Sequence, residues 1–380
     1  MLTNEQTAWH SGFSMGLPVM LVDGRPTVAR WSNSEEEYRA ARQAAAIFDR
    51  SYLGRLRATG ADVLDLLNRL STNKVDALQP GRGARTVFTT NKGRIVDQVT
   101  MLRAPDHVLL GTSEGAIGPV AQWLDTYTIT EDATFDDVSQ QTVQFTVAGP
   151  KAQQLIGAAF GQVAHALESV SCTIVKGTGG DVFIARTDSL NMPTYEVIAP
   201  LDMATAVWER LVRTGQPMGA LPAGEETLEA VRIETGVPRY GHEVTESHNP
   251  LEAELNDAIS WNKGCYIGQE VVARLRTYHK VQRYLVRLAL NTHEPPPQGA
   301  RLLVDGKDAG FVTSAAKVPG QPGVRALAYL RTAFVKQGTV VQVELANGAF
   351  ATGSVVWVPE LPEEAMTPAQ LLALAEEPEE

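Results

Sequence analysis

A chain of 380 residues is long for a single hydrophobic core, which predicts two or three domains. The net charge of −11 argues against nucleic acid as a partner, and no apolar run is long enough to span a membrane. The N-terminus shows no secretory signal pattern, and two cysteines, Cys172 and Cys265, do not make a disulfide framework. We therefore expect a cytoplasmic protein that binds neither nucleic acid nor membrane.

The first half of the chain mixes helical and extended patterns. Apolar residues at helical spacing predict helices over 35–48, capped by Ser32 or Ser34, and over 60–70. Strands over 86–90 and 95–102 flank a turn and predict a hairpin. The other expected elements are strands at 109–113, 142–147, 181–186 and 195–198, and helices at 117–125, from 149 onward, 201–213 and 225–234. Strands and helices mixed without a regular βαβ rhythm predict an α+β fold.

The pattern changes after about residue 281. Short strands separated by turns are expected at 282–290, 301–304, 309–314, 325–330, 339–345 and 351–357. Regularly spaced strands of this kind predict a small antiparallel barrel or sandwich. Residues 359–380 contain seven acidic residues and neither Lys nor Arg, so they form an acidic tail.

Residues 263–270, K-G-C-Y-I-G-Q-E in sequence, place Cys265 just before an expected amphipathic helix. The helix N-terminus and the nearby ammonium group of Lys263 would both favour the thiolate form of this cysteine. A buried, inert cysteine at a tight turn is the structural alternative. Residues 263–287 also hold six basic residues against one acid, Glu270. This cationic patch is either a solvated helix face or a site for an anionic ligand.

The octapeptide at 263–270 closely resembles the K-G-C-Y-x-G-Q-E signature of the YgfZ family. These proteins are folate-binding relatives of the glycine-cleavage T-protein (aminomethyltransferase) and are implicated in maintaining iron–sulfur enzymes. Further segments that resemble the T-protein are 46–51 (G-x-F-D-x-S), 70–75 (L-x-T-N-D-V), 91–97 (N-x-x-G-x-I-x-D), 148–152 (Q-G-P-K-A) and 232–241 (R-L-E-x-G-L-P-x-Y-G). Their order and spacing make the resemblance specific over most of residues 30–358.

The resemblance implies a three-domain cloverleaf around a central hole that admits folate. Residues 1–245 would form the folate-binding region, two intertwined α+β domains of which one is inserted at about 52–138. Residues 246–281 would be a connector that carries the K-G-C-Y-I-G-Q-E motif. Residues 282–358 would form a C-terminal antiparallel β-barrel, followed by the acidic tail at 359–380.

The resemblance also assigns candidate residues for tetrahydrofolate. Glu196, with Tyr195 beside it, and Arg232 match the T-protein residues that hold the pterin ring. A carboxylate can accept a pair of N–H bonds from an aminopyrimidine edge. Asp97 retains one acid of the T-protein D-D pair that acts on the folate nitrogen, whereas the R-T-G-Y-T-G-E element of T-proteins is altered at 186–192. Lys263 belongs to the cationic patch and is a candidate for binding the glutamyl tail.

Each of these residues has a structural alternative, since Glu196 could face water and Asp97 could be an exposed hairpin residue. The seven histidines and two cysteines show no metal-ligand spacing, so we expect no metal site.

The resemblance therefore implies a tetrahydrofolate-binding protein that supports iron–sulfur cluster assembly or repair, with iron–sulfur proteins as partners. Cys265, accessible beside the folate cavity, would act as nucleophile, sulfur carrier or cluster contact. A folate-dependent aminomethyltransferase or related one-carbon transferase is the alternative, and the acid retained at Asp97 favours it. A folate-responsive scaffold without covalent chemistry is a third possibility.

Overall fold

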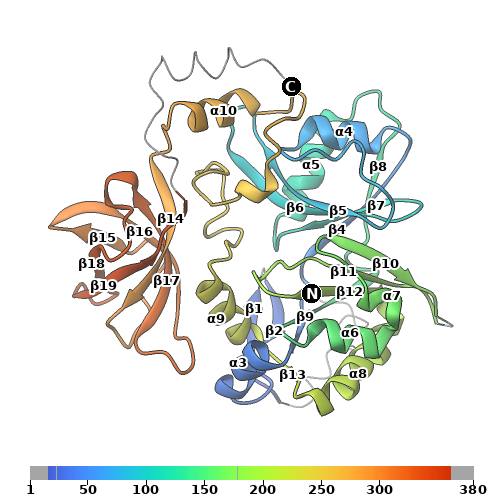
Figure 1. The fold of residues 1–380 in the computed structure, drawn as a ribbon, viewed down its shortest axis with the longest axis horizontal. Helices are drawn as coiled ribbons and strands as arrows, with labels where there is room; N and C mark the ends of the chain where they lie inside the picture. Colours follow the sequence, from blue (N-terminus) through green and yellow to red (C-terminus); the bar gives the residue numbers. More distant parts are fainter. Residues whose placement is uncertain (1–15, 23, 178, 361–380) are drawn as a thin grey trace, which may run out of the picture.

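The computed structural model describes residues 16–22, 24–177 and 179–360, which fold into three lobes (Figure 1). One lobe is built on a six-stranded sheet, another on a five-stranded sheet, and the third is a closed barrel. A two-stranded ribbon of β1 (Val19–Val22) and β2 (Arg25–Val28) stands apart from these sheets. Helices and mainly antiparallel strands are mixed throughout, which confirms the α+β class.

The six-stranded sheet has the order β10-β11-β12-β9-β3-β13. Its strands are β3 (Ala46–Asp49), β9 (Thr142–Ala148), β10 (Ser171–Val175), β11 (Val182–Arg186), β12 (Thr194–Pro200) and β13 (Leu221–Pro222). Its helices are α3 (Ser34–Gln43), α6 (Ala152–Phe160), α7 (Gln162–His165), α8 (Ala204–Gly215), α9 (Glu225–Thr235), η1 (Leu201–Met203) and η2 (Gln216–Met218). A hydrophobic core joins α6 and α8 to one face of this sheet, with Phe145, Tyr195 and Trp208 among its buried side chains.

The helix expected over 35–48 is wrong at its C-terminal end. Helix α3 stops at Gln43, and Ala46–Asp49 form the strand β3. This strand pairs with β9 on one side and β13 on the other, so tertiary pairing overrides the helix propensity of the alanine run. The expected cap at Ser32 or Ser34 is also wrong, because the side chain of Asn33 accepts the hydrogen bond from the amide of Glu35 at 2.8 Å.

The five-stranded sheet has the order β5-β6-β7-β4-β8. Its elements are β4 (Gly54–Thr59), α4 (Val63–Leu70), β5 (Gly83–Thr89), β6 (Ile95–Arg103), β7 (Val108–Thr112), α5 (Ile117–Tyr127) and β8 (Thr134–Asp137). All of them lie between β3 and β9 along the chain, so this lobe is inserted into the other. Strands β5 and β6 pair antiparallel, which confirms the expected hairpin.

The barrel closes in the order β14-β17-β16-β15-β18-β19 and confirms the expected antiparallel β-barrel. Its elements are β14 (Arg283–Leu290), β15 (Arg301–Val304), β16 (Lys307–Ala316), β17 (Val324–Arg331), η4 (Thr332–Phe334), β18 (Val340–Glu344) and β19 (Phe350–Trp357). Apolar side chains that alternate along these strands fill its interior.

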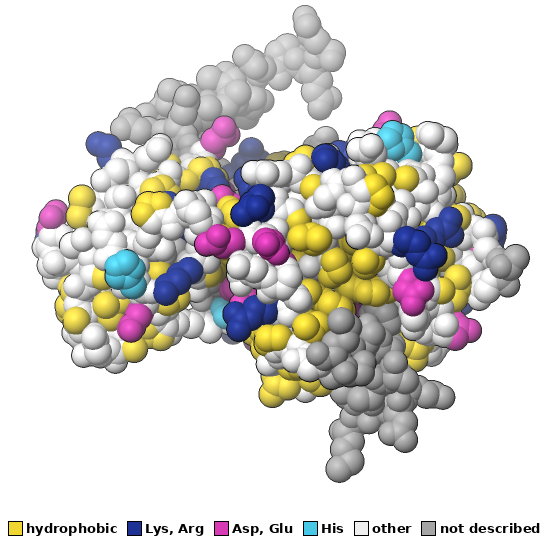
Figure 2. Space-filling view, turned by 90° about the horizontal axis from the view of Figure 1, so that it is seen from below, with side chains coloured by type: hydrophobic (Ala, Val, Ile, Leu, Met, Phe, Trp, Pro, Cys, Tyr) yellow, Lys and Arg dark blue, Asp and Glu magenta, His cyan; other side chains and the backbone are white. Residues whose placement is uncertain are grey.

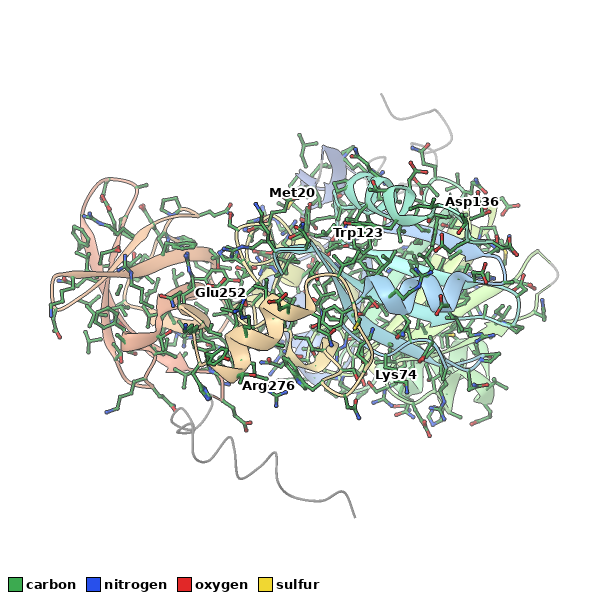
Figure 3. All side chains as sticks on the ribbon, turned by 90° about the horizontal axis from the view of Figure 1, so that it is seen from above. Met20, Lys74, Trp123, Asp136, Glu252 and Arg276 are labelled. Atoms are coloured by element: carbon green, nitrogen blue, oxygen red, sulfur yellow. The ribbon has the colours of Figure 1, made fainter. Side chains whose placement is uncertain are left out.

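A connector leads from α9 to the barrel through η3 (Asn256–Ala258) and α10 (Gln269–Thr277). Figure 3 shows α10, with Arg276, between the barrel and the five-stranded sheet, and Glu252 on the adjoining part of the connector. The domain boundaries at 245, 281 and 358 stay a prediction, and the acidic tail beyond residue 360 lies outside the described residues. Within the described part of the chain, every helix is too short or too polar to cross a membrane.

Candidate functional site

A cavity of about 950 Å³ lies at the junction of the three lobes. Its walls include Glu196 from β12, Gln98 from β6, Arg232 from α9, Glu254 from the connector and Trp357 from the barrel. Figure 2 shows basic and acidic side chains gathered near the middle of one face, beside the barrel lobe. The volume is near the upper end of the range of about 300–1,000 Å³ that is typical of ligand pockets.

Strand alternation sends the two adjacent candidates on β12 in opposite directions. Glu196 lines the cavity, whereas Tyr195 is fully buried in the core under α6 and α8. Successive side chains on a strand point to opposite faces of the sheet, so both cannot reach the same ligand. The structure therefore does not bring Tyr195 to the site, contrary to its prediction as a binding residue.

The register of β9 against β12 determines the surroundings of Glu196. Thr146 lies directly opposite Glu196, and Gln144 lies on β9 two residues before Thr146. Both side chains donate to Oε2 of Glu196, at 2.6 Å from Thr146 Oγ1 and 2.9 Å from Gln144 Nε2. Among the described residues no hydrogen bond reaches Oε1, so this buried carboxylate keeps one oxygen for a ligand.

Arg50, which the sequence analysis missed, lines the same cavity directly after β3. Its backbone amide donates to the carbonyl of Gln144 at 2.9 Å, and its Nε donates to the hydroxyl of Tyr52 at 3.4 Å. Burial opposes its charge, but Tyr52, Glu196 and Glu225 hold the pKa of Arg50 above its ordinary value. Carboxylate and guanidinium groups thus line one wall, and together they suit a ring with N–H donors and a carbonyl acceptor.

Arg232 lines the cavity as predicted, but the protein already occupies all of its donors. Nε and Nη2 bind the carboxylate of Glu229, and Nη1 donates to Glu243 and to the carbonyl of Val237, both at 3.3 Å. Nη2 also donates to the hydroxyl of Ser314 at 2.7 Å. A guanidinium has five N–H donors, so a ligand would have to displace one of these contacts.

A second arginine, Arg239, organises the acids on the same side of the cavity, and it too was missed. Its guanidinium pairs with Glu114 at 2.5 Å, with Glu229 at 2.9 Å and with Glu225 at 3.6 Å. Glu225 accepts a hydrogen bond of 2.9 Å from the hydroxyl of Tyr52. Glu114 and Tyr52 lie far from Arg239 and the α9 glutamates in sequence, so no local motif could have shown that they meet.

Asp97 is fully buried on β6 and does not itself line the cavity, although two residues beside it do. Its Oδ2 accepts a hydrogen bond of 2.9 Å from the amide of Ser113, and Ser113 and Gln98 both line the cavity. Its Oδ1 is buried and has no hydrogen-bond partner among the described residues. Burial raises the pKa of Asp97 to about 7, although hydrogen bonds from Ser113 and Gln98 act in the opposite direction. The structural alternative of an exposed hairpin residue is therefore excluded, and the catalytic role of Asp97 stays a prediction.

The segment that carries Cys265 lies against the five-stranded sheet instead of the cavity. Cys265 is exposed, but neither it nor Lys263 is among the cavity-lining residues. The ammonium group of Lys263 donates to the carbonyls of Asn68, Ser71 and Asn73, each at 2.7 Å. These bonds use its three donors, and burial lowers the pKa of Lys263 to about 8. Lys263 therefore anchors the loop, and the expected position of the thiol beside the cavity is not found.

Acidic, histidine and cysteine side chains of the described residues form no group of three or more that could hold a metal ion. Most of the charged side chains that line the cavity are instead ion-paired with one another. The fold and the site together define a three-lobed protein whose described residues enclose a polar cavity of ligand size where the lobes meet.

The comparisons with known proteins identify this class. Residues 5–263 match the GCVT N-terminal domain, and residues 283–356 match the glycine cleavage T-protein C-terminal barrel domain. The chain therefore belongs to the glycine-cleavage T-protein family. Its fold is similar to the crystal structure of glycine cleavage system aminomethyltransferase T from Bartonella henselae, with a TM-score of 0.81 and 22% sequence identity. This similarity covers 91% of this chain and 95% of that one.

Three relatives show how the chain compares in sequence. Aminomethyltransferase from Symbiobacterium thermophilum is 29% identical over 343 residues, which are 88% of this chain and 91% of that protein. Aminomethyltransferase from Bacillus subtilis is 28% identical over 319 residues, or 83% and 88% of the two chains. A putative chloroplastic transferase from Arabidopsis thaliana is 29% identical over 327 residues, or 83% and 72%. These names favour the transferase alternative, and the narrower YgfZ membership stays a prediction.

Proposed function

We propose that this protein is a folate-dependent aminomethyltransferase or a related one-carbon transferase with tetrahydrofolate in the central cavity. The observation that carries the proposal is the free oxygen of Glu196 on the same cavity wall as the guanidinium of Arg50. An aminopyrimidinone edge offers N–H donors to the carboxylate and a carbonyl oxygen to the guanidinium, so these residues fit a pterin. Arg232 supports this wall through Glu229, which it shares with Arg239.

Asp97 supports transferase chemistry over simple binding. Its carboxyl is buried beside two residues that line the cavity, and its pKa of about 7 lies near physiological pH. A group whose pKa lies near the working pH can both accept and release a proton at little cost in free energy. Proton transfer during one-carbon chemistry requires such a group. Two nitrogens of tetrahydrofolate would bind the carbon of the aminomethylated carrier, whose amine leaves as ammonia and whose carrier group leaves in turn. The two leaving groups take up the two protons that the folate nitrogens lose, and Asp97 would relay one of these protons.

The test is a pair of measurements on the full chain. Titration of the wild type with tetrahydrofolate should show saturable binding, and an assay with an aminomethylated carrier should yield methylene-tetrahydrofolate. Asp97→Asn should retain binding but lose at least a hundredfold in turnover, in line with general acid–base contributions of about 10²–10⁴. Wild-type protein that does not bind tetrahydrofolate would rule out the proposal.

The exposed thiol of Cys265 favours a second candidate, a YgfZ-type role in iron–sulfur cluster assembly or repair with iron–sulfur proteins as partners. Cys265 and Cys172 are both free thiols, which suits the reducing cytoplasm that we propose as the location. In a strain that lacks the protein, Cys265→Ala should fail to restore iron–sulfur enzyme activity under this candidate. Full restoration would exclude a role for the thiol.

A further inference from the structure

Glu254, in the connector, has an unusual backbone conformation for its residue type. Its φ of +58° lies in the left-handed region, where the Cβ of an L-residue crowds the following carbonyl. The side chain nevertheless lines the central cavity. Backbone strain of this kind persists where the surrounding structure enforces it, and it is concentrated at functional sites. The left-handed conformation of Glu254 is therefore consistent with a functional role for its carboxyl group.

Glu254 also differs from most other acids of the cavity. Seven acidic residues line it, and five of them, Glu114, Glu225, Glu229, Glu234 and Asp257, form ion pairs with arginines. Among the described residues, Glu196 and Glu254 are the two that form none. Glu196 is held by two hydrogen bonds from β9, whereas Glu254 receives a single long contact of 3.4 Å, from Asn256 to Oε2.

The other carboxyl oxygen of Glu254 accepts no hydrogen bond from the described residues. Oε1 is buried and has no hydrogen-bond partner in the described part of the chain. Burial raises the pKa of Glu254 to about 8, so the free protein holds this group largely as a neutral acid near pH 7. A cation that docks against it would reverse this preference and bind the ionised form, whereas an anion would be repelled from that form.

The cavity has room for a second reactant. Its volume of about 950 Å³ is near the upper limit for a site that encloses one drug-sized ligand. Glu196 and Arg50 belong to the six-stranded lobe, whereas Glu254 extends from a separate element, the connector. We propose that Glu254 binds the ammonium group of the substrate that donates the one-carbon unit. This inference rests on the proposed transferase function and deepens it by assigning the amine end of the second substrate.

Two probes test the ligand chemistry in the full chain. Methylammonium chloride should raise the unfolding temperature of the wild type, whereas tetramethylammonium chloride should not, because it has no N–H to donate. Glu254→Gln, which keeps the shape of the side chain without its charge, should bind methylammonium at least tenfold more weakly. Its affinity for tetrahydrofolate should stay within about threefold of the wild type. A wild type that does not respond to methylammonium, or a Glu254→Gln variant that responds equally, would overturn the assignment.

A glycine variant separates function from folding. Glu254→Gly should unfold at or above the wild-type temperature, because glycine adopts positive φ without strain, and yet lose the methylammonium response. Asp305→Gly is the matched control, since Asp305 has a φ of +50° at an exposed turn of the barrel. It should keep the full response. If methylammonium binds through Glu254 but tetrahydrofolate does not bind, Glu254 is an ammonium site, and the proposed transferase function fails together with the assignment of this site to its substrate.

Discussion

Arg232 on α9 donates a hydrogen bond of 2.7 Å to the hydroxyl of Ser314 on β16, and this contact ties the barrel to the helix that lines the cavity. Ser314 in turn donates to Glu243 at 2.7 Å, and Glu243 also accepts from Arg232. The junction of the lobes is thus a closed network of charges. Its members hold the cavity walls in place before any ligand arrives.

Arg232→Met should destabilise the protein by about 3–5 kcal/mol, because it leaves the fully buried Glu243 without its main counter-charge. The measurement is the free energy of unfolding in denaturant. Arg213→Ala, which removes an exposed ion pair on α8, is the control and should change stability by at most about 0.5 kcal/mol. Equal effects of the two substitutions would contradict a structural role for Arg232.

Glu196→Ala should weaken tetrahydrofolate binding roughly 10- to 100-fold, since charge-assisted hydrogen bonds contribute about 1.5–3 kcal/mol. Calorimetric titration measures this directly. Tyr195→Phe serves as the control on the opposite face of β12, because its hydroxyl has no hydrogen-bond partner among the described residues. Its affinity should equal that of the wild type, and a loss as large as that of Glu196→Ala would mean that the strand faces are assigned wrongly.

Arg50→Leu should also weaken tetrahydrofolate binding, by roughly tenfold, because it removes the guanidinium donor from the cavity wall that also holds Glu196. Loss of the guanidinium should leave the fold intact, since in the described part of the chain the Arg50 side chain makes a single hydrogen bond, 3.4 Å long, to the hydroxyl of Tyr52. Thermal unfolding checks the fold, and the same titration checks binding. Unchanged affinity in a folded variant would remove Arg50 from the site.

Asp97 should make stability depend on pH. Its pKa is about 7 in the folded protein and 3.8 ordinarily, so between these values the folded state retains a proton that the unfolded state has lost. Stability is therefore highest below about pH 4 for this group and falls as pH rises to about 7, by at most about 4 kcal/mol. Asp97→Asn removes this loss and should be more stable than the wild type at pH 8. A difference between the two proteins that is the same at pH 5 and pH 8 would refute the shifted pKa.

The two thiols should react very differently. Cys265 is exposed, whereas Cys172 is buried and burial raises the pKa of its thiol to about 12. Iodoacetamide should therefore modify Cys265 alone in the native protein and both residues after unfolding, as mass spectrometry can show. Modified Cys265 should leave tetrahydrofolate affinity unchanged, because the residue does not line the cavity. Blocked binding would place the thiol closer to the folate than the structure does.

Local sequence patterns predicted an element correctly where turns and strand spacing determine its structure. Short, regularly spaced strands separated by turns predicted the barrel, and one of these turns, Asp305-Gly306, joins β15 to β16. The alanine-rich segment before Phe48 was misread as helix. Its strand exists because two neighbouring strands offer hydrogen bonds that a local pattern does not contain.

The sequence by itself determined the family motifs and most of the α+β elements, and it indicated Glu196 and Asp97 as candidate acids of the folate site. Only the tertiary structure decided which side chains share a cavity. Arg50 and Glu254 line it, whereas four predicted residues do not: Asp97, Tyr195, Lys263 and Cys265. The physical reason is that burial, strand register and ion pairing arise between segments far apart in the chain. These long-range contacts determine which polar groups are already satisfied and which remain free to bind a ligand.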